Sequence, residues 1–263
     1  MTQSSLAQDL ALARRLAVLG SELALEYLKR GFQTEIKPDG SPVTDADVAV
    51  ERALRELITR ERPSDAILGE ELGASGASGR CWVLDPIDGT KQFISGRPEW
   101  GTHVALEIDG RVALGVITRP SRGASFWASR GAGAFQSELS ASAQGERLQV
   151  SEASDLERAR VTTWGRVSEP VLKQLEERTR YVQSGADAVL ALARGDLEAV
   201  IECGGKAWDH APAVVIVEEA GGRYSDPEGG QRIDHAQAWY TNAGIHEPLL
   251  QLLRSAVARD GRH

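Results

Sequence analysis

The chain of 263 residues has a mass of 28.3 kDa, which suits one large domain or two closely packed halves. Its formal net charge of −8 argues against a basic face that binds nucleic acid. The sequence contains no run of about eighteen apolar residues, so we expect no membrane-spanning helix. The N-terminal segment does not resemble a signal peptide, and two cysteines make no disulfide framework, so we expect a cytoplasmic protein.

The first part of the chain begins with a helical pattern and continues with strands. Apolar residues recur at helical spacing through 5–30, and Thr44 fits the N-cap of a second helix whose third residue is Asp47. Short apolar runs at 66–69 and 81–84 predict buried strands that end beside carboxylates. Asp109-Gly110, between β-prone segments, predicts a tight hairpin.

Beyond about residue 150, strand and helix patterns alternate. We expect strands at 161–164, 197–202 and 238–241, and helices at 168–179, 186–194, 209–220 and 246–258. Hairpins first and alternation later predict a layered α/β (α+β) protein. The two patterns also predict two halves without a flexible linker, residues 1–145 and 146–263.

The segment from Trp82 to Thr90 carries the strongest chemical signal. An apolar strand brings Asp85 to its end, Pro86 is expected to turn the chain, and Asp88 then returns toward the same point. Gly89 lets the backbone approach a ligand, and a helix beginning after it directs free N–H groups at an anion. Carboxylates beside an anion site call for a divalent cation between them, and oxygen donors without clustered His or Cys favour Mg²⁺.

Each acidic position also has a purely structural interpretation. Asp85 and Asp88 suit a surface turn with solvated side chains, because Asp, Pro and Gly all form turns. Asp47 fits a capping box, and Asp209, at the start of an apolar helix, fits an N-cap. The pair Glu70-Glu71, at the end of a strand, has no packing role that the sequence indicates.

Taken together, these acidic segments resemble the inositol monophosphatase superfamily. The resemblance runs from about residue 5 to 250 and rests on Gly69-Glu70-Glu71, Asp85–Thr90, Trp208–Ala213 and Glu219–Gly222. It implies a layered αβαβα sandwich of the inositol monophosphatase/fructose-1,6-bisphosphatase type. It also implies a phosphoric monoester hydrolase that uses roughly two or three Mg²⁺ ions, with Mn²⁺ as a possible substitute. Lithium inhibition and a homodimer are further expectations from the family.

The resemblance also implies roles for individual residues. The first metal would be bound by Glu70, Asp85 and the Ile87 carbonyl, and the second by Asp85, Asp88 and Asp209. Asp47 and Thr90, helped by Glu70, would orient and deprotonate the attacking water. The N–H groups of Gly89 and Thr90 would hold the phosphate. The expected substrate contacts are Asp88, Asp187, Lys91, Glu202 and Asp209. Most metal ligands therefore fall in the first half, and Asp209 and Glu202 in the second.

The stretch after Thr90 resembles the histidinol-phosphate phosphatase branch. Lys91 follows the threonine there, and a Gly-x-Pro-x-aromatic pattern follows at 96–100; the segment 37–44 is also similar. Gly185-Ala186-Asp187 departs from the Gly-Asp pairing of that branch. L-Histidinol phosphate, of histidine biosynthesis, is thus the leading substrate, with inositol phosphates and other sugar or nucleotide phosphates as alternatives. Lys91 is equally consistent with a solvated position, and Glu202 with an exposed carboxylate on an edge strand.

Two other functions fit parts of the pattern. Haloacid-dehalogenase phosphatases pair aspartates two residues apart, whereas Asp85 and Asp88 are three apart with proline between them. A non-catalytic acidic metal-binding protein is the second alternative, and Asp47 and Thr90, placed to handle a water, argue against it. His210 is expected to be a packed or exposed histidine. We expect a small phosphorylated metabolite as partner, and neither nucleic acid nor membrane.

Overall fold

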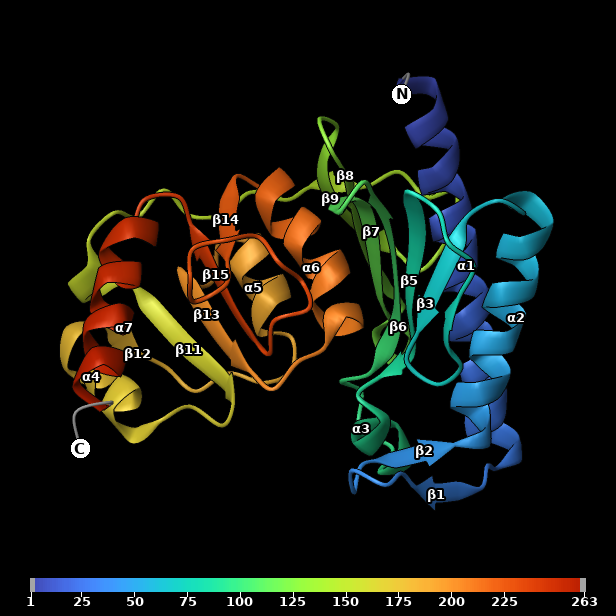
Figure 1. Ribbon diagram of the computed structural model, residues 1–263, viewed down its shortest axis with the longest axis horizontal. Coiled ribbons are helices and arrows are strands. Elements are labelled where there is room, and N and C mark those ends of the chain that lie inside the picture. Colours follow the sequence, from blue (N-terminus) through green and yellow to red (C-terminus); the bar gives the residue numbers. More distant parts are fainter. Residues whose placement is uncertain (1–2, 261–263) are drawn as a thin grey trace.

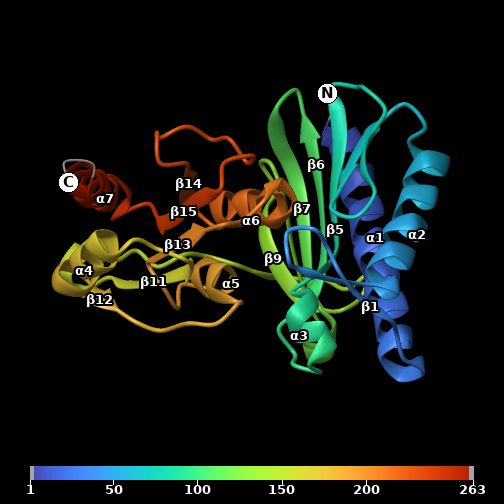
Figure 2. The same cartoon turned by 60° about the horizontal axis from the view of Figure 1, so that its bottom comes forward.

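The computed structural model describes residues 3–260, which form five alternating layers of helices and sheets (Figure 1). Helices α1 (Gln3–Arg30) and α2 (Asp45–Glu61) cover one face of an eight-stranded sheet. Helices α5 (Ala188–Ala193) and α6 (Ala207–Glu219) lie between that sheet and a five-stranded sheet, as Figure 2 also shows. The outer layer consists of α4 (Glu169–Arg178) and α7 (His246–Asp260). This order confirms the predicted αβαβα sandwich.

The larger sheet is mostly antiparallel and the smaller one is mixed. The first contains β3 (Ala66–Gly69), β4 (Gly73–Ser75), β5 (Arg80–Asp88), β6 (Gly101–Ile108), β7 (Arg111–Arg119), β8 (Ala124–Ser129), β9 (Gly133–Glu138) and β10 (Glu146–Arg147). The second contains β11 (Arg160–Gly165), β12 (Arg180–Tyr181), β13 (Ala199–Cys203), β14 (Gly222–Ser225) and β15 (Gln237–Asn242). In spatial order they run β10-β9-β8-β7-β6-β5-β3-β4 and β12-β11-β13-β15-β14, so β13 is a central strand.

Shorter elements lie outside the two sheets. A hairpin of β1 (Thr34–Ile36) and β2 (Pro42–Thr44) precedes α2, and the one-turn helix α3 (Thr90–Ile94) follows β5. Two 3₁₀ turns occupy Pro120–Arg122 and Leu156–Arg158. Within the range 3–260, no helix has both the length and the apolar character needed to cross a membrane.

Apolar packing between the layers explains the character of α6. One core joins α1 and α2 to the larger sheet, a second surrounds α5 and α6, and a third joins the smaller sheet to α4 and α7. Residues 210–217 of α6 are all buried because the helix faces a sheet on either side, so it is not amphipathic. Asp209 lies in the first turn of this buried helix, which itself lies between the two sheets (Figure 1).

Several local predictions are confirmed. Thr44 caps α2, and its hydroxyl and the Asp47 carboxylate form a reciprocal capping box. The β6–β7 turn has positive φ at both central residues, 51° at Asp109 and 78° at Gly110, as a tight hairpin of type I′ requires. The larger sheet extends to Arg147, and the division of the chain at residue 145 stays a prediction.

The predicted turn at Pro86 is wrong. The backbone stays extended to Asp88, and the pairing with β6 slips between Asp85↔His103 and Asp88↔Gly101. Two residues of β5 therefore face one residue of β6, which is a β-bulge. In a regular strand, residues three apart point to opposite faces, and the extra residue brings Asp85 and Asp88 to the same side. The convergence of the two aspartates was expected, but a bulge produces it.

Close contact between β7 and α6 gives a test of this packing. A Cβ added to Gly115 would lie 2.5 Å from Pro212 Cα and 2.9 Å from Val215 Cγ1. We expect Gly115→Ala to destabilise the protein by about 1–3 kcal/mol, because the helix must move off the sheet. Gly185→Ala is the control, since nothing lies within 4 Å of its added Cβ. Urea unfolding measures both variants, and equal stabilities would contradict the close packing.

Candidate active site

Carboxylates from four separate segments gather around Asp85. This side chain is 2% exposed at the bulge of β5. Burial raises the pKa of Asp85 well above its usual range, and nearby negative charges raise it further, those of Glu70, Asp88, Asp209 and Asp47. The neighbours come from the end of β3, the end of β5, the first turn of α6 and the first turn of α2. Acidic groups far apart in sequence thus share one site, as the sequence predicts.

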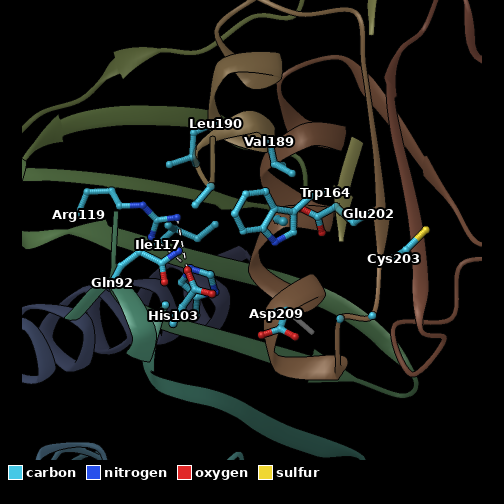
Figure 3. Close-up of a pocket in the computed structure, with 16 residues that line it drawn as sticks. Gln92, His103, Ile117, Arg119, Trp164, Val189, Leu190, Glu202, Cys203 and Asp209 are labelled. Atoms are coloured by element: carbon cyan, nitrogen blue, oxygen red, sulfur yellow. Dashed lines mark hydrogen bonds and ion pairs between the residues drawn. The ribbon is translucent and has the colours of Figure 1, made fainter. Parts of the chain in front are cut away.

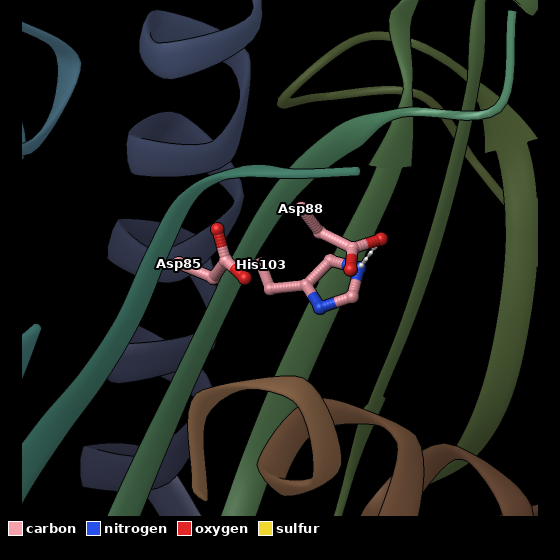
Figure 4. Close-up of side chains that lie close together, drawn as sticks. All are labelled: Asp85, Asp88 and His103. Carbon is pink, nitrogen blue, oxygen red and sulfur yellow. Dashed lines mark ion pairs between the residues drawn. The ribbon is translucent and has the colours of Figure 1, made fainter. Parts of the chain in front are cut away.

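The site has the properties that a bound cation requires. Asp85 Oδ1 is buried and has no hydrogen-bond partner within the described range 3–260, an arrangement that is unfavourable for a carboxylate left alone. Atoms of Asp85, Asp88 and His103 able to bind a metal lie within 4.8 Å of one another (Figure 4). The donors around Asp85 are mainly hard oxygens, the ligands that Mg²⁺ prefers. These residues therefore fit a divalent metal.

Two positively charged or polar groups contact one oxygen of Asp88. His103 Nε2 lies 3.2 Å and an Arg119 nitrogen 3.5 Å from Asp88 Oδ2. Burial by itself raises the pKa of Asp88, but the His103 ring and the Arg119 guanidinium lower it to about 2. Asp88 is therefore ionised at neutral pH.

Lys37, at the end of the β1–β2 hairpin, contacts the acidic pair after β3. Its Nζ lies 2.9 Å from Glu70 Oε1 and 2.7 Å from Glu71 Oε1. Burial lowers the pKa of Lys37, but the bonds to Glu71 and Glu70 outweigh burial and raise it above its usual value. Burial and the charge of Glu70 raise the pKa of Glu71 to about 7, against the opposing effect of Lys37. The sequence did not indicate this role for Lys37.

Asp47 and Thr90 meet although they are far apart in sequence. The Thr90 hydroxyl donates toward Ile87 O at 3.2 Å and lies 3.4 Å from Asp47 Oδ1. Asp47 is fully buried, and its second oxygen accepts from Thr44. Burial raises the pKa of Asp47, which the bonds to Thr44 partly offset. Asp47 thus serves the helix cap with one oxygen and faces Thr90 with the other.

A cavity of about 270 Å³ opens beside these groups, between the two sheets (Figure 3). Its first wall comes from the larger sheet and α3 and includes Asp88, Gly89, Gln92, His103 and Arg119. Its second wall comes from the smaller sheet, α5 and α6 and includes Trp164, Val189, Leu190, Glu202 and Asp209. Burial and the charge of Asp88 raise the pKa of Asp209 to about 6. Segments associated with both sheets therefore contribute to one pocket.

Glu202 projects into the cavity from β13, a central strand, so its interpretation as an edge-strand carboxylate is wrong. Its Oε2 lies 3.4 Å from His210 Nδ1, and the Tyr240 hydroxyl lies 3.3 Å from the same nitrogen. His210 is fully buried, which agrees with the packed alternative. A Cβ added to Gly205 would lie 2.5 Å from His210 Nε2, so only glycine leaves room for the ring.

Two predicted substrate contacts lie outside the residues that line the cavity. Lys91 is exposed, and its neighbour Gln92 lines the cavity instead. Asp187 forms ion pairs with Arg119 and Arg122. The roles of both residues stay predictions.

Sequence reasoning missed His103, Arg119 and Trp164. His103 and Arg119 lie in strands that are mostly apolar and buried, and a few polar residues in such a strand are a weak signal of function. Trp164 lies within the predicted strand at 161–164, and its exposure of 43% is revealed only by the structure. Their proximity to the acidic residues depends on strand pairing and cannot be read from local patterns.

Comparison with known proteins identifies the family. The sequence pattern of the inositol monophosphatase family matches residues 5–259. The chain belongs to the inositol monophosphatase family. Together with its histidinol-phosphatase relatives, this membership makes the chain a phosphoric monoester hydrolase.

Individual relatives cover nearly the whole chain. A Streptomyces griseus protein named glucose-1-phosphate thymidylyltransferase is 43% identical over 254 residues, 95% of this chain and 98% of its own length. The histidinol-phosphatase of Mycobacterium tuberculosis is 36% identical over 260 residues, 94% of this chain and 98% of its own. The solved structure of a Thermotoga maritima IMPase has a TM-score of 0.81 at 27% identity and covers 98% of this chain and 99% of its own. The fold and the family are therefore established, whereas the activities stated in the names of these relatives differ from one another.

The raised pKa of Asp209 predicts how pH affects the metal-free protein. The ordinary pKa of this carboxyl is 3.8 and its pKa in the folded protein is about 6, so folding favours the protonated form. The contribution of Asp209 to the free energy of unfolding is therefore fully present below pH 3.8 and is lost as the pH rises through 6. In EDTA, Asp209→Asn should therefore be neutral near pH 4 and more stable than the native sequence by about 1 kcal/mol at pH 7. Urea unfolding at both pH values measures this difference. A variant less stable at pH 7 than at pH 4, relative to the native sequence, would contradict the assignment.

Proposed function

We propose that this protein is a Mg²⁺-dependent phosphomonoesterase whose substrate is L-histidinol phosphate. The observation that carries the proposal is the gathering of carboxylates around buried Asp85, two of which, Asp88 and Asp209, line the cavity. The opposite wall offers a different chemistry, with Glu202 and the half-exposed ring of Trp164. The first wall suits a phosphoryl group with its metals, and the second suits an organic leaving group.

Glu70, Asp85, the Ile87 carbonyl, Asp88 and Asp209 would hold the metal ions. When bound, Mg²⁺ neutralises phosphoryl oxygens and makes water easier to deprotonate. The protein supports this chemistry by holding two of these ligands in place: Asp209 accepts from the Lys206 N–H at 2.6 Å, and Lys37 contacts Glu70. The N–H groups of Gly89 and Thr90, at the start of α3, would hold the phosphate oxygens.

Asp47 and Thr90 would manage the attacking water. The Thr90 hydroxyl lies 3.2 Å from Ile87 O and 3.4 Å from Asp47 Oδ1, so rotation can turn its one O–H from the carbonyl to Asp47. In that orientation it donates a hydrogen bond to Asp47 and can accept one from a water. Asp47 is buried and fixed by the α2 cap, so it keeps its direction when a proton arrives. Glu70 is the third member of the proposed group.

The second wall supports the choice of histidinol phosphate. The leaving group of that ester carries a primary ammonium and an imidazole. Glu202 presents a carboxylate for the ammonium, and the Trp164 ring presents a face for a cationic ring, a contact of about 0.5–1 kcal/mol at exposed sites. Similarity to three histidinol-phosphatases, at 33–36% identity, supports the same choice.

Other activities among the relatives define the alternatives. The Thermotoga maritima relative named fructose-1,6-bisphosphatase/inositol-1-monophosphatase is 30% identical, so an inositol phosphate is the second candidate. The name of the Streptomyces griseus relative raises nucleotidyl transfer as a third. We also propose that the enzyme is a cytoplasmic homodimer that binds neither nucleic acid nor membrane, as the sequence indicates.

Loss of one ligand tests the metal site. Asp88→Asn keeps the size of the side chain and removes its charge, so we expect turnover to fall below detection while the fold is retained. EDTA should abolish the activity of the native sequence and Mg²⁺ should restore it. Phosphate release measures the rate, and circular dichroism checks the fold.

Asp109→Asn is the matched control, since the same substitution lies at the tip of the β6–β7 hairpin, away from the cavity. It should retain the native rate. A near-native rate for Asp88→Asn would refute the ligand assignment.

A substrate panel tests the choice of ester. It contains L-histidinol phosphate, inositol 1-phosphate, fructose 1,6-bisphosphate and adenosine 3′,5′-bisphosphate, with phosphate release as the readout. A separate arm follows pyrophosphate release from dTTP and glucose 1-phosphate. We expect the highest kcat/KM for histidinol phosphate and no pyrophosphate. A higher kcat/KM for any other ester would refute histidinol phosphate as the substrate and leave the phosphatase assignment intact.

A further inference from the structure

Arg119 occupies an unusual position for a guanidinium, because it contacts both a proposed metal ligand and the opposite half of the molecule. Its side chain is 4% exposed at the end of β7. One terminal nitrogen lies 3.5 Å from Asp88 Oδ2, and Nε lies 2.6 Å from Asp187 Oδ1, at the start of α5. The other terminal nitrogen donates to the Thr118 carbonyl at 2.9 Å. All three nitrogens are thus engaged, which fixes the plane of the guanidinium.

The contacts to Asp88 leave one of its oxygens available. The contacts recorded for His103 Nε2 and Arg119 are both with Oδ2, at 3.2 and 3.5 Å (Figure 4 shows the His103 contact). A carboxylate held in this way has one defined orientation and still presents its second oxygen to a cation. Outer partners of metal ligands commonly have this function.

His103 itself is a poor candidate for a metal ligand, although its ring is close to Asp85 and Asp88. An Arg119 nitrogen lies 3.4 Å from His103 Nε2, so a cation bound at that nitrogen would meet a fixed positive charge at short range. Contact with Asp88 is therefore the better use of this ring nitrogen.

Asp187 holds Arg119 in place and makes no capping bond to its own helix. An aspartate at the N-cap of a helix usually accepts a bond from the N–H groups of that helix, which stabilises it by about 1 kcal/mol. Asp187 is the N-cap residue of α5 but makes no such bond, and its two oxygens pair with Arg119 and Arg122 instead. Arg122 is in turn 3.6 Å from Glu99. The ion pairs replace the cap and connect α5 to β7.

The backbone also makes room for this arrangement. A Cβ added to Gly101, in β6, would lie 2.8 Å from an Arg119 nitrogen and would overlap the Thr118 carbonyl group. Only glycine at this position allows the guanidinium and the neighbouring carbonyl to approach β6 so closely.

We propose that Arg119 is a positioning residue, held by Asp187, that fixes the Asp88 carboxylate for metal binding. This inference rests on the proposed function, since it takes Asp88 as a Mg²⁺ ligand. It links the second half of the chain, through α5, to the metal site in the first. Any substrate that displaces α5 would thereby also disturb Asp88.

Isothermal titration calorimetry of the metal-free protein with MgCl₂ tests the proposal without any substrate. We expect Arg119→Met and Asp187→Asn each to weaken Mg²⁺ binding by about 10-fold or more. The double variant should be no weaker than the poorer single variant, because both substitutions break one chain of contacts. Mg²⁺ affinity of Arg119→Met within about threefold of native would overturn the proposal. If Arg119→Met does not fold, Asp187→Asn decides by the same criterion.

Arg130→Met is the matched control. Arg130 also joins the two halves, since it pairs with Glu218 of α6 and donates to Val112 O at 2.9 Å, but it does not line the cavity. It should lower the thermal midpoint and leave Mg²⁺ affinity unchanged. Equal losses of affinity in Arg130→Met and Arg119→Met would show a general structural effect and overturn the proposal.

Asp88→Asn separates this inference from the proposed function. If Asp88→Asn binds Mg²⁺ as the native sequence does, the ligand assignment fails, and the proposed function with it. If Asp88→Asn loses binding while Arg119→Met and Asp187→Asn retain it, only the positioning role fails.

Discussion

Mutual repulsion among carboxylates around Asp85 is the constraint on which the rest of the site depends. A buried acidic group next to other acidic groups is unfavourable unless cations or hydrogen bonds compensate it. Burial first, and this repulsion in addition, raise the pKa values of Asp85 and Asp209 in the metal-free protein. The protein tolerates it because the acidic groups are carried on elements that are stabilised elsewhere, by the apolar cores around α2, α6 and the larger sheet. The apolar contacts that stabilise the layers therefore lie apart from the carboxylates that repel one another.

Two of the carboxylates are also held by a bond within their own helix, and a third is held by a neighbouring strand. Asp47 completes the cap of α2, Asp209 accepts from the first turn of α6, and Asp88 is held across the sheet by His103. In the first two cases a single side chain stabilises a helix with one oxygen and faces the site with the other. A capping role and a role at the site are thus compatible. The prediction that Asp209 is itself the N-cap is wrong, because Lys206 takes that place and Asp209 is the third residue of α6. The capping geometry is what fixes the direction of the free oxygen.

Local sequence patterns predicted what depends on local physics. The helix beginning at Thr44, the Asp109-Gly110 hairpin and the alternation beyond residue 150 follow from capping, turn chemistry and periodicity, and all are present. The turn expected at Pro86 was wrong because a bulge depends on the register between β5 and β6, which no short window contains. Arg119 was missed for the same reason, since its contacts to Asp88 and Asp187 join residues distant in sequence. Similarity to the family predicted the acidic residues of the site, whereas the residues that hold them in place became evident only from the three-dimensional structure.

The two walls of the cavity explain how one fold can serve several substrates. Acidic groups at the ends of β3, β5 and the start of α6 face the position proposed for the phosphoryl group, which every phosphate ester shares. Trp164 and Glu202 lie on the smaller sheet and line the second wall, beside the position proposed for the part of the ester that differs. Changes on the second wall can alter substrate choice without disturbing the carboxylates, provided that the contacts between the halves are kept. The ion pair between Arg119 and Asp187 is such a contact. We therefore expect substitutions that change the leaving group to be tolerated better in β11 and β13 than at the start of α5.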